Sequence, residues 1–416
     1  MHVVFCPCGA HPALSSGPVA QCCEHDAMEK PASLPMSRAS FLLGGTAAAS
    51  VPSAELPAIA SPRDSTTRRG RRALILSGGA NRGVYAAGAI TALAETAGLR
   101  DGQPLPYDLV CGTSIGALNG YFVATAQYSQ LRRLWELVST RPVFEPKSPY
   151  NHLANNASGI GTRLYAAFHL AIGLLQRVKG VVNPRGVRDL LHEEFKPAET
   201  FHIPLYISVT NITRQRNEMF VLRATSAGGI QRQEINDRLL DDFHRDPIRT
   251  VDEHSFFDVF FATAALPLVF DPVLIPHQDD PTKADEYIDG GITKNIPADI
   301  ALHCADAVHT MLVEPLDSRV EIAYANASEI GLGVFSTMQR RIIELGLYLA
   351  YADKRSSTTP LPFKASIIQP AQELPGEFGD FSDRVALQRG WEMGYRDGLR
   401  GWRPFEPPIR GLVTND

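Results

Sequence analysis

Two apolar segments constrain the fold most, because each is followed at once by a glycine-flanked turn and then by a run rich in small residues. Segment 73–76 precedes a turn at 77–83, and segment 107–111 precedes a turn at 112–116. Short apolar runs bounded by turn residues are typical of buried strands, and the runs after the turns predict helices. Two strand-turn-helix units in succession imply parallel strands. We therefore expect an α/β fold with a mainly parallel central sheet.

Later segments continue this pattern. Three apolar runs fit further strands of the same sheet: 205–209, 219–222 and 308–313. Segment 163–182 has apolar residues on one helical face, which ordinary core packing explains better than a lid or a membrane-facing surface. Helical patterns in the last quarter of the chain cover 330–351 and 383–399.

The composition is that of an ordinary globular protein. The chain has 416 residues, 44% of them hydrophobic, and a formal net charge of −5 at pH 7. A negative net charge without a long run of lysine and arginine gives no electrostatic basis for nucleic-acid binding. We expect no metal site either, since the cysteines crowded near the amino end lack the paired spacing of zinc ligands: Cys6, Cys8, Cys22 and Cys23.

Residues 1–70 differ from the rest of the chain. They are rich in proline, serine, alanine and glycine and show no sustained periodicity, so we interpret them as a leader and linker. Within them, 36–60 combine the basic Arg38, a short apolar core and small residues, which favours an export signal and a periplasmic or secreted protein. The alternative is a disordered leader on a cytoplasmic or peripheral membrane protein.

Ser114 is the candidate nucleophile. It lies at the centre of the pentad Gly112-Thr113-Ser114-Ile115-Gly116, where a predicted strand turns into a predicted helix. A sharp turn at this place lifts the serine hydroxyl above the sheet, at the amino end of a helix whose N–H groups favour developing negative charge. The pentad alone is weak evidence, so its position on a strand-to-helix turn carries most of the argument.

The upstream glycine loop is a candidate oxyanion hole. Backbone N–H groups of such a loop bind either a phosphate or an oxyanion. A dinucleotide site is disfavoured because Ala80 replaces a required glycine and no acidic residue ends a second strand about twenty residues on. Neighbouring parallel strands would bring the loop beside Ser114. The loop comprises Gly78, Gly79, Ala80, Asn81, Arg82 and Gly83.

Asp289 is the candidate base for the serine. It ends an apolar strand and is followed by Gly290 and Gly291, which permit a tight turn that carries the carboxylate into a site. The histidines lie in segments that do not resemble catalytic loops, so a Ser-Asp dyad is favoured over a triad. The histidine-assisted alternative would use one of four residues: His254, His277, His303 or His309.

Taken together, these motifs resemble the patatin-like phospholipases. That family combines a glycine-rich oxyanion loop, a Gly-x-Ser-x-Gly turn, an Ala-Ser-x-x-x-Pro segment and an Asp-Gly-Gly or Asp-Gly-Ala. This chain has 78–83, 112–116, Ala-Thr-Ala-Ala-Leu-Pro at 262–267 and 289–291, in the family's order. It departs at Ala80, which costs stability if its φ is positive, and at Thr263, which keeps the hydroxyl of the usual serine.

The resemblance implies a fold, a division of the chain and an activity. The fold is a three-layer α/β/α domain over 71–320, and we expect 321–416 to form a helical extension packed on it. The activity is hydrolysis of lipid acyl esters, phospholipase A type, by Ser114 and Asp289 with the glycine loop as oxyanion hole, without metal or organic cofactor. The substrate is a lipid or phospholipid reached by peripheral membrane contact. The alternatives are an acyltransferase, a short-chain esterase and a catalytically degenerate lipid-binding module.

Overall fold

The computed structural model describes most of the chain after residue 69. The described residues, which all belong to one compact unit, Ser61–Asp416, are 70–140, 145–146, 180, 182–197, 199–222, 246–267, 269–277, 279–316, 338, 340–343, 345–347 and 364–405. The expected leader with its export signal, the cysteines near the amino end and most of the amphipathic segment 163–182 lie outside these residues. No helix among the described residues is long and apolar enough to cross a membrane.

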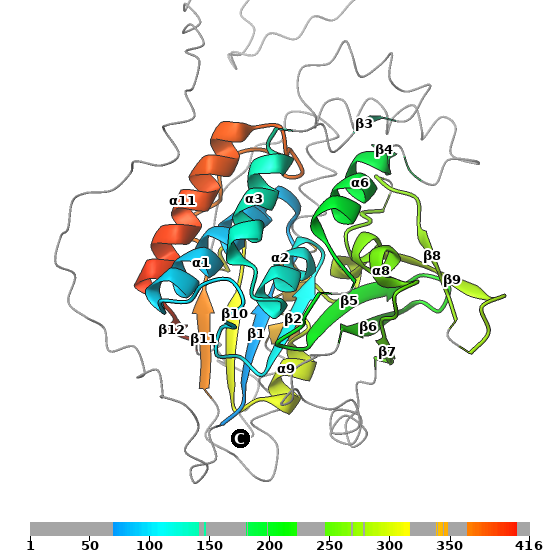
Figure 1. Cartoon of the computed structure of the whole chain (residues 1–416), viewed down its shortest axis with the longest axis horizontal. Helices are drawn as coiled ribbons and strands as arrows, with labels where there is room; N and C mark the ends of the chain where they lie inside the picture. The colour runs from blue at the N-terminus through cyan, green and yellow to red at the C-terminus, as the bar shows by residue number, and fades with distance from the viewer. Residues whose placement is uncertain are drawn as a thin grey trace, which may run out of the picture. The chain divides into compact units, whose positions relative to one another are not determined.

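The centre of the structure is a ten-stranded mixed sheet (Figure 1). Its order is β12-β11-β10-β1-β2-β5-β6-β7, and β9 pairs with both β5 and β8. The five consecutive strands β11, β10, β1, β2 and β5 are all parallel to one another, as expected from the strand-turn-helix units. The strands are β1 (Arg72–Leu76), β2 (Leu109–Thr113), β5 (Leu205–Asn211), β6 (Arg216–Leu222), β7 (Ile248–Thr250), β8 (Val273–Pro276), β9 (Ala284–Asp289), β10 (Ala307–Met311), β11 (Lys364–Ile368) and β12 (Arg403–Pro404). A separate two-stranded sheet pairs β3 (Glu145–Pro146) with β4 (Val182–Asn183).

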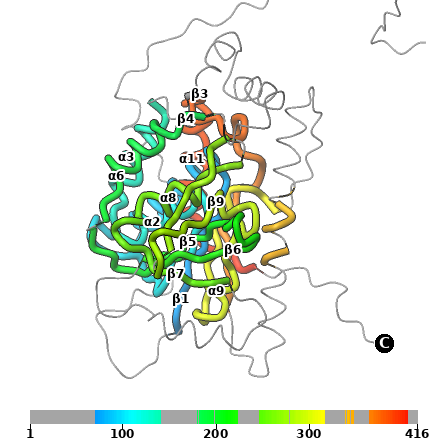
Figure 2. Tube along the Cα trace, turned by 90° about the vertical axis from the view of Figure 1, so that its right-hand side faces the viewer, coloured from blue at the N-terminus to red at the C-terminus, as the bar shows by residue number. Residues whose placement is uncertain are grey.

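Helices cover both faces of the sheet. In Figure 2, α3 and α6 lie on one side of the strands and α9 on the other. The helices are α1 (Gly83–Thr96), α2 (Ile115–Ala124), α3 (Tyr128–Val138), α6 (Arg185–Glu194), α8 (Phe256–Thr263), α9 (Ala298–Cys304) and α11 (Arg384–Arg400), with short 3-10 helices η2 (Ala80–Arg82) and η3 (Gly290–Ile292). The fold is therefore the expected three-layer α/β/α arrangement.

The side chains of the strands contribute alternately to two separate hydrophobic cores, one on each face of the sheet. On β1, Leu74 and Leu76 pack with α1 and α2, whereas Ala73 and Ile75 pack with α9 on the opposite face. Successive strand residues point to opposite faces, and here both faces are covered, so the buried part of β1 is apolar on both faces. This explains the continuous apolar run at 73–76 in the sequence.

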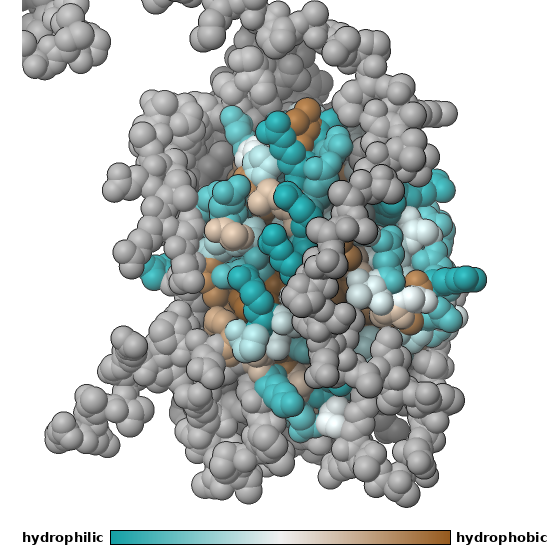
Figure 3. All heavy atoms as spheres, turned by 90° about the vertical axis from the view of Figure 1, so that its left-hand side faces the viewer, coloured by the Kyte–Doolittle hydropathy of each residue, from teal (hydrophilic) through white to brown (hydrophobic). Residues whose placement is uncertain are grey.

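The carboxyl end of the chain is part of the sheet, which differs from the expected helical extension over 321–416. β11 pairs in parallel register with β10, and β12 pairs with β11, so this segment adds two strands to the central sheet. α11 is helical as expected and packs along α1, because Gly394 lets the two backbones approach closely: a Cβ there would lie 1.9 Å from the Tyr85 carbonyl oxygen. Figure 3 shows the face of the molecule on the α11 side, where the described side chains are mainly polar with scattered apolar patches.

Candidate active site

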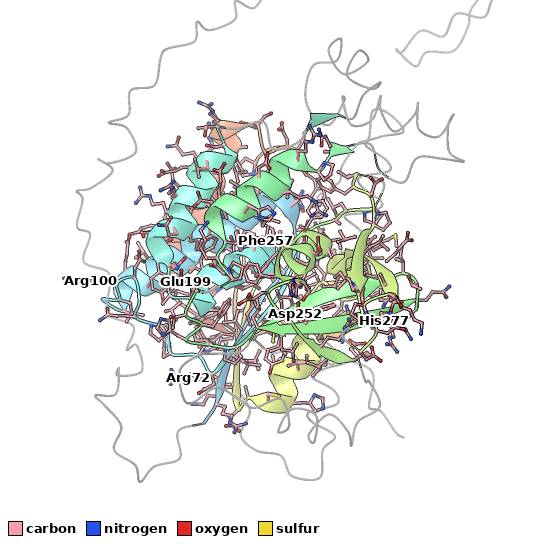
Figure 4. All side chains as sticks on the ribbon, turned by 45° about the vertical axis from the view of Figure 1, so that its right-hand side comes forward. Arg72, Arg100, Glu199, Asp252, Phe257 and His277 are labelled. Atoms are coloured by element: carbon pink, nitrogen blue, oxygen red, sulfur yellow. The ribbon has the colours of Figure 1, made fainter. Side chains whose placement is uncertain are left out.

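The candidate residues gather where two strands meet end to end alongside β5. β2 runs parallel to β5 and ends with Thr113 opposite Ser208. β9 runs antiparallel to β5 and ends with Asp289 opposite the next residue, Val209. The chain leaves β2 at Ser114, so the serine and the aspartate approach each other from opposite directions. Figure 4 labels Arg72, which begins β1 at the other end of the parallel strands.

Ser114 is bonded to Asp289. Its Oγ donates to Asp289 Oδ2 at 2.6 Å, and the two residues are 7% and 1% exposed. Ser114 has φ 54 and ψ −130 directly before α2, a conformation that non-glycine residues rarely adopt. Residues held in such conformations cost about 1–3 kcal/mol and are found at active sites, where the surrounding structure fixes them. The predicted sharp turn at the candidate nucleophile is therefore present.

The glycines of the pentad let α2 begin close to the sheet. A Cβ at Gly116 would lie 2.4 Å from the Leu76 carbonyl oxygen and 2.6 Å from that of Ser77. No side chain fits at such distances, so the small residue is needed for the helix to start directly beside the end of β1. Gly112 lies near the end of β2, where a Cβ would lie 2.7 Å from the Ala117 backbone nitrogen, and Ile115 begins α2.

The carboxyl group of Asp289 is buried and bonded on both oxygens. Oδ1 accepts the Gly291 N–H at 2.7 Å and Oδ2 accepts the Ser114 hydroxyl. Burial disfavours the charged carboxylate and raises the pKa of Asp289 to about 7, although the hydrogen bonds from Ser114 and Gly291 act in the opposite direction. A carboxyl group with a pKa near neutrality can both accept and return a proton at physiological pH.

Segment 262–267 holds both members of this pair in place. The Thr263 hydroxyl accepts the Ser114 N–H at 2.8 Å and donates to the Ser208 carbonyl oxygen at 2.7 Å. Two residues later, the Ala265 carbonyl oxygen accepts the Asp289 N–H at 2.9 Å. The hydroxyl that threonine shares with serine is therefore used, and this use explains why the change at Thr263 is compatible with the site.

The glycine loop lies directly beside the serine. A Cβ built on Gly78 would lie 3.1 Å from Ser114 Cβ. The Gly78 N–H donates to Asn295 Oδ1 at 2.7 Å, which ties the loop to the segment after Asp289. The N–H groups of Arg82 and Gly83 donate to carbonyl oxygens within the loop.

These bonds correct the expectation that N–H groups throughout 78–83 are available to an oxyanion. Those of Gly78, Arg82 and Gly83 already have protein acceptors. In the part of the chain that the structure describes, no acceptor is recorded for the N–H groups of Gly79 and Ala80. Ala80 has φ 49, the positive value at which the sequence analysis expected replacement of glycine to cost stability.

A second set of bonds joins the turn at Ser114 to the segment after Asp289. The carbonyl oxygen of Lys294 accepts the hydroxyls of Thr113 and Ser208, at 3.0 and 3.1 Å. The Lys294 ammonium is ion-paired with Asp246 and Asp299. Of these residues only Thr113 was among the predicted site residues, because strand pairing between distant segments is what brings the others to it.

The histidines are bonded away from the pair. His277 lies at the β8–β9 hairpin, labelled in Figure 4, with Nε2 3.1 Å from Asp285 Oδ1. His309 Nδ1 is 2.9 Å from Tyr107 Oη, and His303 Nδ1 is 2.7 Å from the Asp299 carbonyl oxygen. His254 lies in the turn before α8. These contacts therefore favour no histidine as a partner of Ser114.

No group of three or more metal-ligating side chains suited to a metal ion occurs among the described residues.

Comparison with protein-family models identifies the family of this chain. The model described as patatin-like phospholipase matches residues 74–302, more than half of the sequence. The chain belongs to the patatin-like phospholipase family. The match spans the glycine loop, the serine pentad, segment 262–267 and Asp289, so the family-typical motifs are those that meet in space. Membership in this family of lipid hydrolases confirms the expected resemblance.

Two further comparisons were with individual proteins. A search of curated proteins found no match. Among solved structures, the chain is similar to one titled "Crystal structure of VipD from Legionella pneumophila", with 14% sequence identity and a TM-score of 0.29. The similarity covers 81% of this chain and 68% of that chain.

Proposed function

We propose that this protein is a serine lipid acyl hydrolase of the phospholipase A type that uses Ser114 and Asp289 as a catalytic dyad. The observation that carries the proposal is the 2.6 Å hydrogen bond from Ser114 Oγ to a buried carboxyl group. A serine hydroxyl is a weak nucleophile until a base accepts its proton, and the base must lie within hydrogen-bond reach. Family membership supports a lipid ester as the substrate.

The first half of the proposed reaction forms an acyl-enzyme. Ser114 Oγ attacks the ester carbonyl carbon while its proton passes to Asp289 Oδ2. The resulting tetrahedral intermediate collapses when the bond to the alcohol breaks, and Asp289 returns the proton to the departing alcohol oxygen. The lyso-lipid leaves, and the fatty acyl group stays on Ser114 as an ester.

The second half regenerates the enzyme. A water molecule attacks the acyl carbon and gives its proton to Asp289, after which Ser114 leaves with that proton and the fatty acid is released. The pKa of Asp289 near 7 suits this double role, since the group ionises close to the pH at which it must accept and donate. No step requires a metal ion or an organic cofactor.

Developing negative charge on the substrate oxygen needs hydrogen-bond donors beside Ser114. We assign this role to the N–H groups of Gly79 and Ala80, because Gly78 next to them adjoins Ser114 and its own N–H is already bonded. Removal of one such donor in a serine hydrolase lowers kcat by about 100-fold to 1,000-fold. The amino end of α2 adds a favourable dipole at the same place.

Fatty-acid release from mixed phospholipid vesicles in the presence of a chelator tests the proposal. We expect release by the wild type and loss of release in both Ser114→Ala and Asp289→Asn. Activity that survives in Asp289→Asn would assign the base to another residue. Release that requires a divalent ion, or vesicle binding without release by the wild type, would overturn the proposal. Products made with an added lyso-lipid acceptor distinguish hydrolysis from acyl transfer.

A further inference from the structure

The side chain of Asn81 is hydrogen-bonded to the carboxyl-terminal part of the chain. Its Nδ2 donates to the carbonyl oxygens of Glu377 and Asp380 at 2.9 and 3.1 Å, and its Oδ1 accepts the Gly379 N–H at 2.8 Å. The residue is 3% exposed. Both donor hydrogens and the acceptor of one amide are thus bonded to the backbone of a single short loop, 377–380.

The next side chain, Arg82, also contacts the carboxyl-terminal part of the chain. Its guanidinium is ion-paired with Glu314 and lies 3.7 Å from Glu373, and it stands 5.4 Å from the centre of the Phe378 ring. Glu314 follows β10, and Glu373 and Phe378 follow β11. These contacts all come from residues beyond 302, where the match to the family model ends.

We propose that loop 377–380 is a clamp that fixes the oxyanion loop and that Asn81 is a positioning residue. The inference rests on the proposed function, because it assigns Asn81 to the support of the N–H groups of Gly79 and Ala80. Asn81 does not touch the reacting atoms. The segment after β11 therefore supports the oxyanion loop even though it lies outside the family-typical motifs.

Backbone strain explains why a clamp is needed. Ala80 has φ 49, and an alanine held there relaxes to a common conformation unless neighbouring contacts prevent it. Asn81 follows directly, so its three hydrogen bonds restrain the backbone at the strained position. Oxyanion donors stabilise a transition state only when they are oriented before the reaction, and this orientation is what the clamp maintains.

Kinetics of Asn81→Ala test the proposal against a purely structural role. We expect kcat for a soluble ester to fall about tenfold or more with KM little changed, because misplaced donors weaken transition-state binding only. The matched control is Tyr128→Phe, since Tyr128 is also buried and bonded to the backbone of a distant loop, at Leu105 and Gln103. This control should lower thermal stability while leaving kcat unchanged.

A milder variant covers the case in which Asn81→Ala fails to fold. Phe378→Ala removes only the ring beside Arg82, and we expect a few-fold decrease in kcat at nearly wild-type stability. An unchanged kcat in Asn81→Ala, or in Phe378→Ala when the first variant does not fold, would overturn the proposal.

Amide hydrogen exchange distinguishes failure of the proposed clamp from failure of the proposed hydrolase function. Loss of the clamp should speed amide exchange in a peptide spanning 79–83 while exchange around Ser114 stays as in the wild type. An inactive wild type with this exchange pattern would contradict the proposed function and retain the clamp. An active wild type whose 79–83 amides exchange equally slowly with and without the Asn81 side chain would contradict the clamp alone.

Discussion

Asp289 and Ala80 show at the scale of single residues how the site departs from ordinary protein chemistry. Asp289 is a carboxyl group whose pKa burial raises to about 7, and Ala80 is an alanine at φ 49. Both conditions are unfavourable in isolation and persist because surrounding hydrogen bonds fix the groups. Each leads to a measurable consequence.

The pKa of Asp289 predicts the pH dependence of catalysis. The base must be ionised to accept the serine proton, so kcat/KM should fall about tenfold per pH unit below the pKa near 7 and level off above it. Steady-state assays with a soluble ester between about pH 5 and pH 9 measure this profile. A rate that is flat down to about pH 5 would mean that Asp289 ionises normally or is not the base.

Replacement of Ala80 by glycine should stabilise the protein. Glycine adopts positive φ without the steric cost that alanine bears, so Ala80→Gly should raise the free energy of unfolding by about 1 kcal/mol. Urea denaturation measures the change. Ala87→Gly in the middle of α1 serves as the control and should destabilise by a similar amount. A decrease for both variants would contradict the strained conformation at Ala80.

At the scale of secondary-structure elements, the segment after α8 links the two halves of the proposed dyad. Thr263 ends α8 and bonds the backbone at Ser114 and Ser208, while Ala265 bonds the backbone at Asp289. A single short segment thereby sets the distance between strands β2 and β9 at their meeting point. Its sequence motif marks a support for the site rather than a reacting group.

The hydroxyl of Thr263 should therefore matter more than its methyl group. Thr263→Val removes the hydroxyl bonds to the buried Ser114 N–H and to the Ser208 carbonyl oxygen, and we expect a loss of about 2 kcal/mol in stability together with lower kcat. Thr263→Ser keeps both bonds and should retain most activity. Thermal denaturation and ester hydrolysis of the two variants provide the comparison. Equal thermal stability and equal activity of the valine and serine variants would show that the hydrogen bonds of the Thr263 hydroxyl contribute nothing.

At the scale of the whole molecule, the family-typical motifs and the carboxyl-terminal segment form one structural unit. β11 continues the sheet beyond β10, and α11 packs on α1. The loop between β11 and α11 is hydrogen-bonded to Asn81. The division at residue 320 expected from the sequence therefore separates segments that share a sheet and a core. Independent folding of 71–320 is not consistent with this arrangement.

Truncation after residue 363 tests this integration. The shortened chain loses β11, β12 and α11, which exposes the edge of β10 and the apolar surface of α1 that packs on α11. Unpaired strand edges and exposed apolar faces favour aggregation, so we expect an insoluble or non-cooperatively unfolding product. A soluble fragment with a cooperative thermal transition and fatty-acid release would contradict the prediction. Truncation after residue 405 keeps all three elements and serves as the control.

Much of the fold and the positions of the candidate residues could be predicted from local sequence. Apolar runs located β1, β2, β5, β6 and β10, and their order with helices indicated parallel pairing. The pentad and the Asp-Gly-Gly turn located Ser114 and Asp289, because sharp turns at strand ends leave a recognisable glycine pattern. The hydrogen bonds by which Asn295, Lys294 and Asn81 support the site could not be predicted, since they join segments far apart in the sequence.

The sequence by itself determined where strands end, where helices begin and which reactive side chains lie on the turns between them, because these properties depend on residues close together along the chain. Only the tertiary structure decided that β9 runs antiparallel to β5 and meets β2 end to end, which N–H groups of the glycine loop remain available, and that the carboxyl-terminal segment completes the sheet. These features depend on hydrogen bonds between residues far apart in sequence, and such pairings become definite only when the whole chain packs.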